Sequence, residues 1–197
     1  MNEIWFRPLV WMDYRLALVF YVFLPFVLLI WTSVKQIQSL QRLLIIYWRV
    51  ASLLMITLYL MIPGWSISFI TSLTARILIP IGLWFWADLN DEIRDLPKTG
   101  VKLAVTAWRW ATTVYCLLGA IATIPFLSCS FSDDTLATPF CQVWLEVPRL
   151  YKNIFHSNSN AGFLGFLGAV GLTVYILYFC YFVFVRLSKQ GRSALLE

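Results

Sequence analysis

Long apolar runs alternate with short polar stretches along this chain. A membrane-spanning helix needs about 20 predominantly apolar residues, because the hydrocarbon core is roughly 30 Å thick and each helical residue rises about 1.5 Å. The pattern therefore predicts an all-α membrane protein in which the whole chain, residues 1–197, forms a single bundle of about five transmembrane helices. The predicted spans cover residues 16–34, 43–61, 67–86, 107–126 and 161–186.

Prolines mark the places where these helices should bend or end. Pro25 and Pro80 lie inside predicted spans and should kink them, because proline removes one backbone hydrogen bond. Pro63-Gly64 predicts a tight turn between the second and third spans. Residues 1–13 mix aromatic and charged side chains, which predicts an amphipathic segment lying in the headgroup region, with a disordered tail as the alternative.

Composition supports the membrane assignment. Hydrophobic residues make up 60% of the chain, charged residues 13%, and the mean hydropathy is +0.76. Soluble domains average about half apolar and about a quarter charged residues. The chain lies well outside that range, and we expect no nucleic-acid partner.

The basic residues predict the orientation, because short cytoplasmic loops are enriched in lysine and arginine. One side of the predicted bundle collects ten of them and the other side four, so the N-terminus should lie outside and the C-terminus in the cytoplasm. The ten are Lys35, Arg42, Arg49, Arg94, Lys98, Lys102, Arg109, Arg186, Lys189 and Arg192, and the four are Arg7, Arg15, Arg149 and Lys152.

Two of the four cysteines are a candidate disulfide. Cys129 and Cys141 share the long outer connection between the last two spans, where a non-cytoplasmic compartment could oxidise them. Closing a loop of this size would stabilise the fold by on the order of 3 kcal/mol. Two free cysteines are the alternative. Cys116 and Cys180 fall inside spans and are expected to act as small apolar side chains.

Arg76 is a charge in the middle of the third predicted span. Such a charge costs about 2.5–3.5 kcal/mol on insertion scales and normally has a partner or a role. No carboxylate falls within the predicted spans, so we expect its partner to be a backbone carbonyl freed near Pro80, a lipid headgroup, water, or an acid on another protein. Snorkelling from a tilted helix is the simplest of these readings.

A compact polar loop follows the third span and holds four of the ten carboxylates of the chain. Its spacing does not fit a calcium-binding loop, because Ile93 and Thr99 stand where glycine and glutamate are needed, and no metal site is expected. The loop instead predicts a short helix capped by Asp88, with the next acids in its first turn. A docking site for a basic partner is the functional alternative. Its candidate residues are Asp88, Asn90, Asp91 and Glu92.

The last span begins with a strip of small residues. A four-residue spacing of small side chains lets two helices approach closely. Packing within the bundle is one use of this strip, and a flat surface for a partner helix or a polyene ligand is the other. The strip consists of Ala161, Gly162, Gly165, Gly168, Ala169 and Gly171.

No pattern of catalytic residues accompanies these features. The lone histidine, His156, lies in the outer connection, so no predicted span offers a histidine to haem or chlorophyll. The sequence holds no metalloprotease, phosphate-loop or nucleophile-elbow motif. We expect a protein that is not an enzyme and requires no cofactor, although its aromatic surface could hold a lipid, chlorophyll or carotenoid.

Four segments carry a resemblance to a small multi-pass membrane family of cyanobacteria. They are Ile4-Trp5-Phe6-Arg7-Pro8-Leu9-Val10-Trp11 with Asp13-Tyr14-Arg15, Tyr47-Trp48-Arg49-Val50-Ala51, Ala75-Arg76-Ile77-Leu78-Ile79-Pro80, and Leu83-Trp84-Phe85-Trp86-Ala87-Asp88-Leu89-Asn90. The family has no assigned activity. The resemblance implies a location in the thylakoid or plasma membrane of an oxygenic phototroph, with the lumen as the outer side.

Together these features predict a non-catalytic thylakoid protein that associates with a larger photosynthetic complex. It would be an assembly factor or accessory subunit, with photosystem II favoured as the partner. The small-residue strip would contact a partner helix and the acidic loop a polar surface. The alternatives are a small carrier or channel subunit that uses Arg76, and a lipid- or carotenoid-binding membrane protein.

Overall fold

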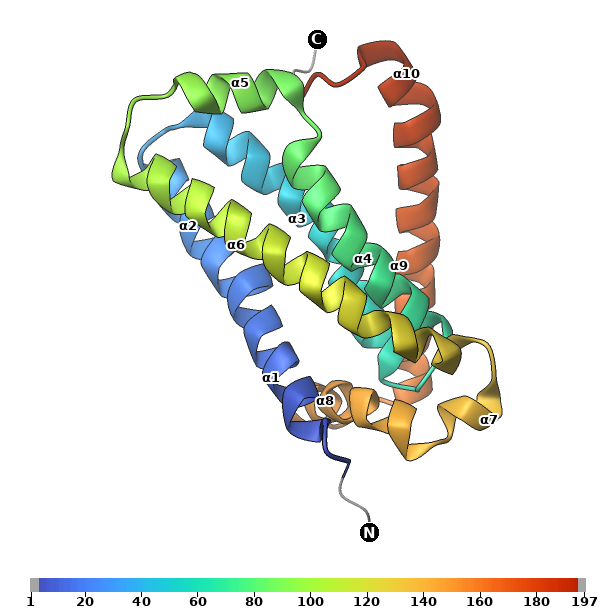
Figure 1. Cartoon of the computed structure of the whole chain (residues 1–197). Coiled ribbons are helices and arrows are strands. Elements are labelled where there is room, and N and C mark those ends of the chain that lie inside the picture. The colour runs from blue at the N-terminus through green and yellow to red at the C-terminus, as the bar shows by residue number, and fades with distance from the viewer. Residues whose placement is uncertain (1–3, 195–197) are drawn as a thin grey trace.

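The protein is a bundle of long helices with shorter helices across both ends (Figure 1). A computed structural model describes residues 4–194, apart from the side chain of Gln190. Five helical segments are long and apolar enough to cross a membrane, which confirms the predicted all-α polytopic fold. The helices are α1 (Arg7–Ala17), η1 (Leu18–Phe23), α2 (Leu24–Val34), α3 (Gln38–Met61), α4 (Ile67–Trp84), α5 (Ala87–Asp95), α6 (Gly100–Thr123), η2 (Ile124–Ser130), α7 (Asp133–Leu136), α8 (Pro139–Phe155), α9 (Ala161–Tyr181), η3 (Phe182–Arg186) and α10 (Leu187–Gln190).

The first span differs most from its prediction. It runs without interruption from Arg7 to Val34, so the segment expected to lie in the headgroup region is its first turns. Pro8 sits at the start of α1, where its missing N–H is not needed. The charges that lower the hydropathy of this segment are paired with other helices, since Arg7 Nε lies 3.0 Å from Glu146 and Asp13 contacts Arg76.

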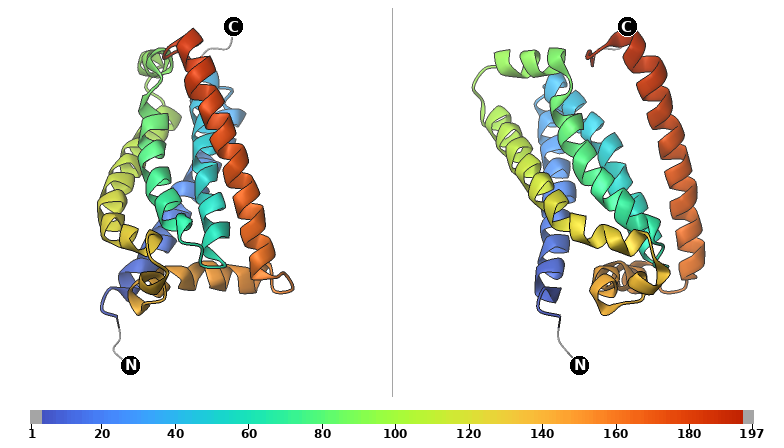
Figure 2. Two further views of the ribbon diagram at one scale, coloured as in Figure 1. Left: turned by 90° about the vertical axis from the view of Figure 1, so that its right-hand side faces the viewer. Right: turned by 45° about the vertical axis from the view of Figure 1, so that its right-hand side comes forward.

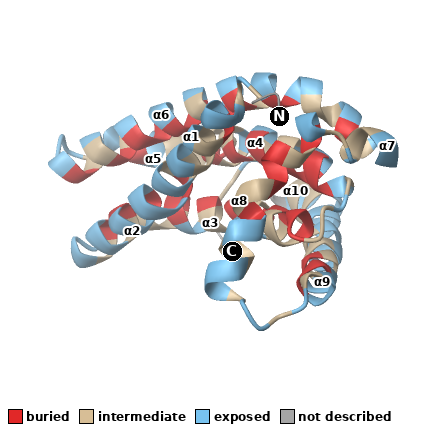
Figure 3. Cartoon of the chain, turned by 90° about the horizontal axis from the view of Figure 1, so that it is seen from below, coloured by how far each residue is buried: buried red, intermediate tan, exposed pale blue. Residues whose placement is uncertain are grey.

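α3 lies at the centre of the bundle. It packs against α2, α4 and α9, and α6 covers the other side of α4 and also contacts α2. The views in Figure 2 agree on this order, with α9 as the outermost helix. Seen along the bundle, buried residues face inward and the outer faces of the long helices are exposed, as expected for surfaces in contact with lipid (Figure 3).

The two ends of the bundle carry different caps. At one end, here called the α8 end, α8 lies across the long helices (Figure 2, left) and Tyr14 of α1 donates a hydrogen bond to Trp144 O at 2.8 Å. At the other end, the α5 end, α5 lies beside the last residues of the described chain (Figure 1). The start of α1 and the end of α10 lie at opposite ends, as an odd number of spans requires.

The α3–α4 turn forms at Pro63-Gly64 as predicted, and Gly64 adopts a φ of +80° that few other residues tolerate. This turn lies against the start of α9. A Cβ atom on Gly165 would come within 2.6 Å of Pro63 Cγ, and one on Gly168 within 3.1 Å of the Leu60 backbone nitrogen. The absence of side chains at both positions therefore lets α9 approach α3.

The small-residue strip thus serves packing within the chain at three of its six positions. Gly171 continues the seam, because a Cβ atom added there would lie 3.2 Å from Ile56 Cγ1. Gly162 is exposed at the helix start, and Ala161 and Ala169 are half-buried. The seam formed by Gly165, Gly168 and Gly171 packs against α3, which is the first of the two uses that the sequence left open.

Substituting Gly165→Ala should destabilise the protein by about 1–3 kcal/mol, because the new methyl group overlaps the Pro63 ring. Gly162→Ala is the matched control on the same helix, since its Cβ meets its nearest neighbour at an ordinary 3.4 Å. Thermal unfolding of the two variants in detergent micelles measures the difference. Equal melting temperatures would contradict the close packing described for this seam.

Candidate functional site

An ion pair joins the first span to α4 inside the bundle. Arg76 Nη2 lies 2.5 Å from Asp13 Oδ2, and Arg76 as a whole is only 5% exposed. Tyr115 of α6 completes the site by donating a hydrogen bond to Asp13 Oδ1 at 2.7 Å. One carboxylate therefore receives an arginine and a tyrosine, and three spans meet at this point.

Gly119 makes room for the arginine. A Cβ atom at this position would lie 1.7 Å from Arg76 Nη1, closer than any two non-bonded atoms can approach. Gly119 is one helical turn beyond Tyr115 on the same face of α6. The two residues thus shape one pocket in the helix surface, which accepts the guanidinium and holds its counter-charge.

This geometry corrects the prediction for Arg76. The inference that no carboxylate of the chain is available within the spans was wrong, because Asp13 belongs to the first span and not to an interfacial segment. The counter-charge is intramolecular, so a lipid headgroup, water or an acid on another protein is not needed for that purpose. A start of the first helix at Arg7-Pro8 is the sequence signal that would have placed Asp13 inside it.

Beyond Asp13, the first span contains a π-helical segment, η1, which ends two residues before Pro25. Proline has no N–H, so carbonyls one turn before it lose their usual donor. Two of these carbonyls accept hydrogen bonds from side chains of other spans. The Tyr47 hydroxyl donates to Tyr21 O at 2.8 Å, and Trp108 Nε1 donates to Phe20 O at 3.0 Å. The helix before Pro25 is therefore a widened turn whose carbonyls are held by α3 and α6.

Arg109 is a second buried arginine, which the sequence pattern had placed among the cytoplasmic charges. Its guanidinium carbon lies 3.8 Å from the centre of the Trp84 ring, and its Nη2 donates to Leu83 O and to Asn90 Oδ1. Trp84 is itself fixed by a 2.9 Å hydrogen bond from its Nε1 to Thr113 Oγ1. The arginine thus ties the end of α4 and the start of α5 to α6.

The acidic loop folds as the short helix α5, but Asp88 does not cap it. Trp86 occupies the N-cap position, and Asp88 lies in the first turn. Its carboxylate accepts hydrogen bonds from Ser193 Oγ at 3.0 Å and from the Ala194 backbone nitrogen at 2.8 Å. Because Ala87 N also donates to Arg192 O, the C-terminal segment is held against the beginning of α5.

The four loop residues predicted to meet a partner therefore separate into two pairs. Asp88 and Asn90 are engaged within the chain, with Asn90 bonded to Trp84 O as well as to Arg109. Asp91 and Glu92 are exposed, and Asp91 forms a 3.0 Å surface pair with Arg94. The first pair is occupied by contacts of the fold, and only the second pair remains on the surface.

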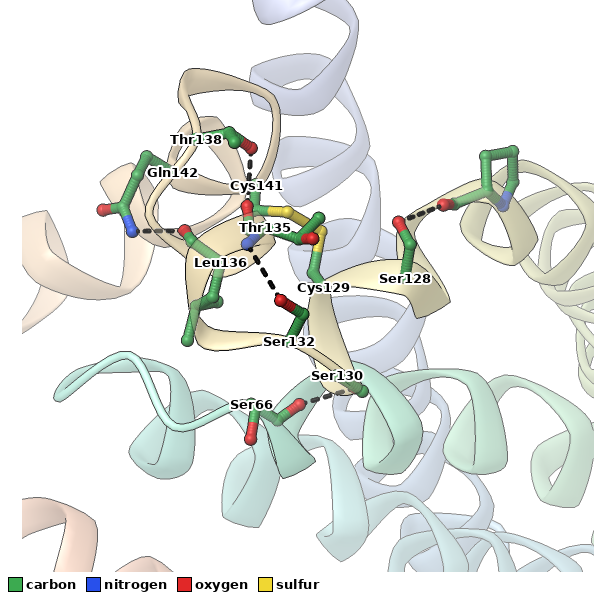
Figure 4. Close-up of a disulfide and its surroundings, with 11 residues drawn as sticks. Ser66, Ser128, Cys129, Ser130, Ser132, Thr135, Leu136, Thr138, Cys141 and Gln142 are labelled. Carbon is green, nitrogen blue, oxygen red and sulfur yellow. Dashed lines mark hydrogen bonds between the residues drawn. A yellow bond between two sulfur atoms is a disulfide. The ribbon is translucent and has the colours of Figure 1, made fainter.

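Cys129 and Cys141 form a disulfide, the first of the two alternatives left open by the sequence (Figure 4). The bond connects the end of η2 to the start of α8. Beside it, Ser130 donates to Ser66 O at 2.6 Å. The cap at the α8 end is thus linked to the α6 span by a covalent bond and to the start of α4 by a hydrogen bond.

The lone histidine lies at the same end, beside two tyrosines. His156 Nε2 is 3.0 Å from the Tyr59 hydroxyl, and its ring lies 5.8 Å from that of Tyr151. Burial raises the pKa of Tyr151, and the nearby Tyr59 raises it further. Across residues 4–194, no three His, Cys, Asp or Glu side chains come together as metal ligands, and the arrangement shows an aromatic contact between α3 and α8.

Comparison with known proteins gives a family for this architecture. Residues 7–195 match the family described as "Protein of unknown function (DUF3177)". The chain belongs to this family. No curated protein and no solved structure matches it. The matched region begins at the first residue of α1 and includes all five candidate spans, so Asp13, Arg76 and the disulfide lie within the part of the chain that defines membership.

Removing the charge of Asp13 should destabilise the bundle strongly. Asp13→Asn leaves the Arg76 guanidinium buried without a counter-charge, a change that costs about 3–5 kcal/mol. Asp134→Asn is the control, because Asp134 is exposed at the α8 end. Thermal unfolding in micelles should separate the two variants, and the double variant Asp13→Leu/Arg76→Met should recover part of the loss. A melting temperature for Asp13→Asn equal to that of the control would refute the pairing.

The disulfide predicts a specific count of reactive thiols. In denatured protein kept from reductant, a maleimide should label two cysteines, Cys116 and Cys180, and after reduction it should label four. Opening the bond should also lower the free energy of unfolding by about 2–4 kcal/mol. Mass spectrometry of the labelled protein gives the count, and four labelled thiols before reduction would contradict the bond.

Proposed function

We propose that the protein is a non-catalytic accessory subunit or assembly factor that binds a larger membrane complex laterally through α9. The observation that carries the proposal is the exposure of this helix. In its most apolar stretch the last span is 17% buried, compared with 44% for α4. Its glycine seam, Leu164 and Tyr175 contact the rest of the bundle, and its opposite side is free to meet another membrane protein.

The outer face of α9 and η3 has the composition of a contact surface. Large side chains recur on the side opposite the glycine seam, and five of them are exposed along the full length of the span. Aromatic residues are enriched where proteins bind one another, because they bury much area at a low entropic cost. The five are Phe166, Val170, Leu177, Tyr181 and Phe184.

The nature of the complex is proposed from the resemblance to the cyanobacterial family. A thylakoid location makes a photosynthetic complex the partner, with photosystem II favoured, and makes the surrounding lipids, chlorophyll or carotenoid candidate ligands of the exposed aromatic surface. In this proposal the α8 end faces the lumen, whose oxidising conditions suit the Cys129–Cys141 bond. The α5 end faces the cytoplasm and presents Asp91 and Glu92.

The alternative of a small carrier or channel subunit has less support. It requires Arg76 to contact a passing anion, whereas this side chain is packed against Asp13 and over Gly119. An arginine whose charge is met by a carboxylate offers little further attraction to a transported anion. The carrier proposal would gain support if substrate-dependent flux into liposomes were abolished by Arg76→Gln.

The proposal is tested by following a tagged copy on a native gel of mildly solubilised host membranes, with mass spectrometry of the bands. The protein should migrate with subunits of a large complex or with its assembly intermediates. The double variant Phe166→Ala/Leu177→Ala removes two large side chains from the outer face of α9, and should lower the fraction in the large complex by about tenfold.

The matched control is Leu118→Ala/Ile121→Ala, which removes similar side chains from an exposed part of α6. It should leave the migration unchanged. The proposal would be abandoned if the unaltered protein migrated alone at monomer or dimer mass. Equal losses for the two double variants would show that the contact is not made by α9.

A further inference from the structure

A pocket of about 520 Å³ opens between α3, α4 and the last span near the α5 end. Its walls come from α3, α4, α9 and η3, and α9 is the outermost of these helices in Figure 2 (right). Most of its walls are aliphatic or aromatic, and its volume is in the range of pockets that hold small organic ligands. The apolar part of the lining includes Ile46, Leu78, Phe179, Phe182 and Val183.

Three arginines interrupt this apolar lining, and among residues 4–194 no aspartate or glutamate is part of it. They are Arg42 and Arg49 on α3 and Arg186 at the end of η3. The side chains of Arg42 and Arg49 form no hydrogen bond and no ion pair with any residue from 4 to 194. The pocket therefore combines apolar walls with two arginines, Arg42 and Arg49, whose charges are not paired within residues 4–194.

Arg49 is the unusual member of this set because of its depth. α3 begins at Gln38, not at the predicted residue 43, so Arg49 lies about 16 Å along the helix axis from its start. A cation this far into a membrane-spanning helix is costly unless an anion or water meets it. Arg76 and Arg109 are both met by acceptors of the chain, whereas Arg49 is exposed at the pocket.

A second apolar groove meets the first pocket at Arg49. It lies between α2, α3 and α9 and shares four residues with the pocket, Ile45, Arg49, Tyr175 and Tyr178. Its other walls include Phe26, Leu29 and Val174. The cation of Arg49 thus lies where the apolar pocket meets the apolar groove. A lipid with one anionic headgroup and two acyl chains would fit this arrangement.

We propose that this junction binds an anionic diacyl lipid. The phosphate or sulfonate group is held by Arg42 and Arg49, and the two acyl chains lie in the pocket and in the neighbouring groove. A free phosphate ion would satisfy the arginines but would leave the apolar walls uncovered. The site is separate from the outer face of α9, so it does not depend on the proposed binding of a larger complex.

The test is native mass spectrometry of the detergent-solubilised protein titrated with two lipids that have the same acyl chains. Phosphatidylglycerol should bind at least tenfold more tightly than phosphatidylcholine. Arg42→Gln/Arg49→Gln should weaken phosphatidylglycerol binding by about thirtyfold, because it removes both charged donors to the anionic headgroup. Glycerol phosphate, which carries the headgroup charge without acyl chains, should bind too weakly to detect.

The matched control is Lys35→Gln/Lys98→Gln. It removes the same number of charges from exposed positions at the same end of the bundle but outside the pocket, and should leave lipid binding unchanged. Val183→Trp keeps all the arginines and fills the apolar part of the pocket, so it should lower phosphatidylglycerol binding as well. This variant keeps the proposal falsifiable if the arginine variant does not fold.

Three results would overturn the proposal. The first is equal affinity for the two lipids, and the second is an equal loss of binding in the arginine and lysine double variants, which would show attraction to the overall charge of that end. The third is glycerol phosphate binding as tightly as phosphatidylglycerol, which would show that the acyl chains make no contact.

Discussion

Hydrocarbon supplies no hydrogen-bonding partner, so a charge inside a membrane bundle has to be met by another polar or charged group. In this protein that condition is fulfilled by the contact between Asp13 and Arg76. The contact fixes the depth of the first span relative to α4, and α6 can approach only with Tyr115 and Gly119 facing it. The relative positions of three helices therefore follow from one ion pair, and the apolar packing fills the space around it.

The same condition governs the backbone around Pro25. The proline frees carbonyls that lipid could not satisfy, and Tyr47 and Trp108 reach across from α3 and α6 to meet them. Carbonyls left without a donor in this way would be costly on a helix that faced lipid. The first span is therefore bound to the bundle by hydrogen bonds at defined depths. The last span, by contrast, is bound mainly along a seam of glycines, with a longer hydrogen bond of 3.4 Å from the Tyr175 hydroxyl to Val50 O.

The number of membrane-spanning helices could be predicted from hydropathy, and the candidate disulfide from the position of two cysteines in one outer connection, although α8 in that connection was not predicted. The ion pair could not, because a charged residue lowers the hydropathy of the segment that contains it, and Asp13 therefore appeared to lie outside the membrane. The partner of Asp88 could not be predicted either, since Ala194 is 106 residues away and belongs to no motif. Spacing showed that small residues line one face of α9, but only the fold shows that α3 covers it.

The distance along the chain between the two charges has a consequence for biosynthesis. Asp13 and Arg76 are 63 residues apart, so the first span leaves the ribosome and meets the membrane before its counter-charge has been made. Tyr115 and Gly119, which complete the site, follow later still. The helix that enters first thus reaches its final position only after the third and fourth spans have arrived. A chain interrupted before Arg76 would expose a lone carboxylate to lipid, a mark by which membrane quality control could distinguish it from the finished protein.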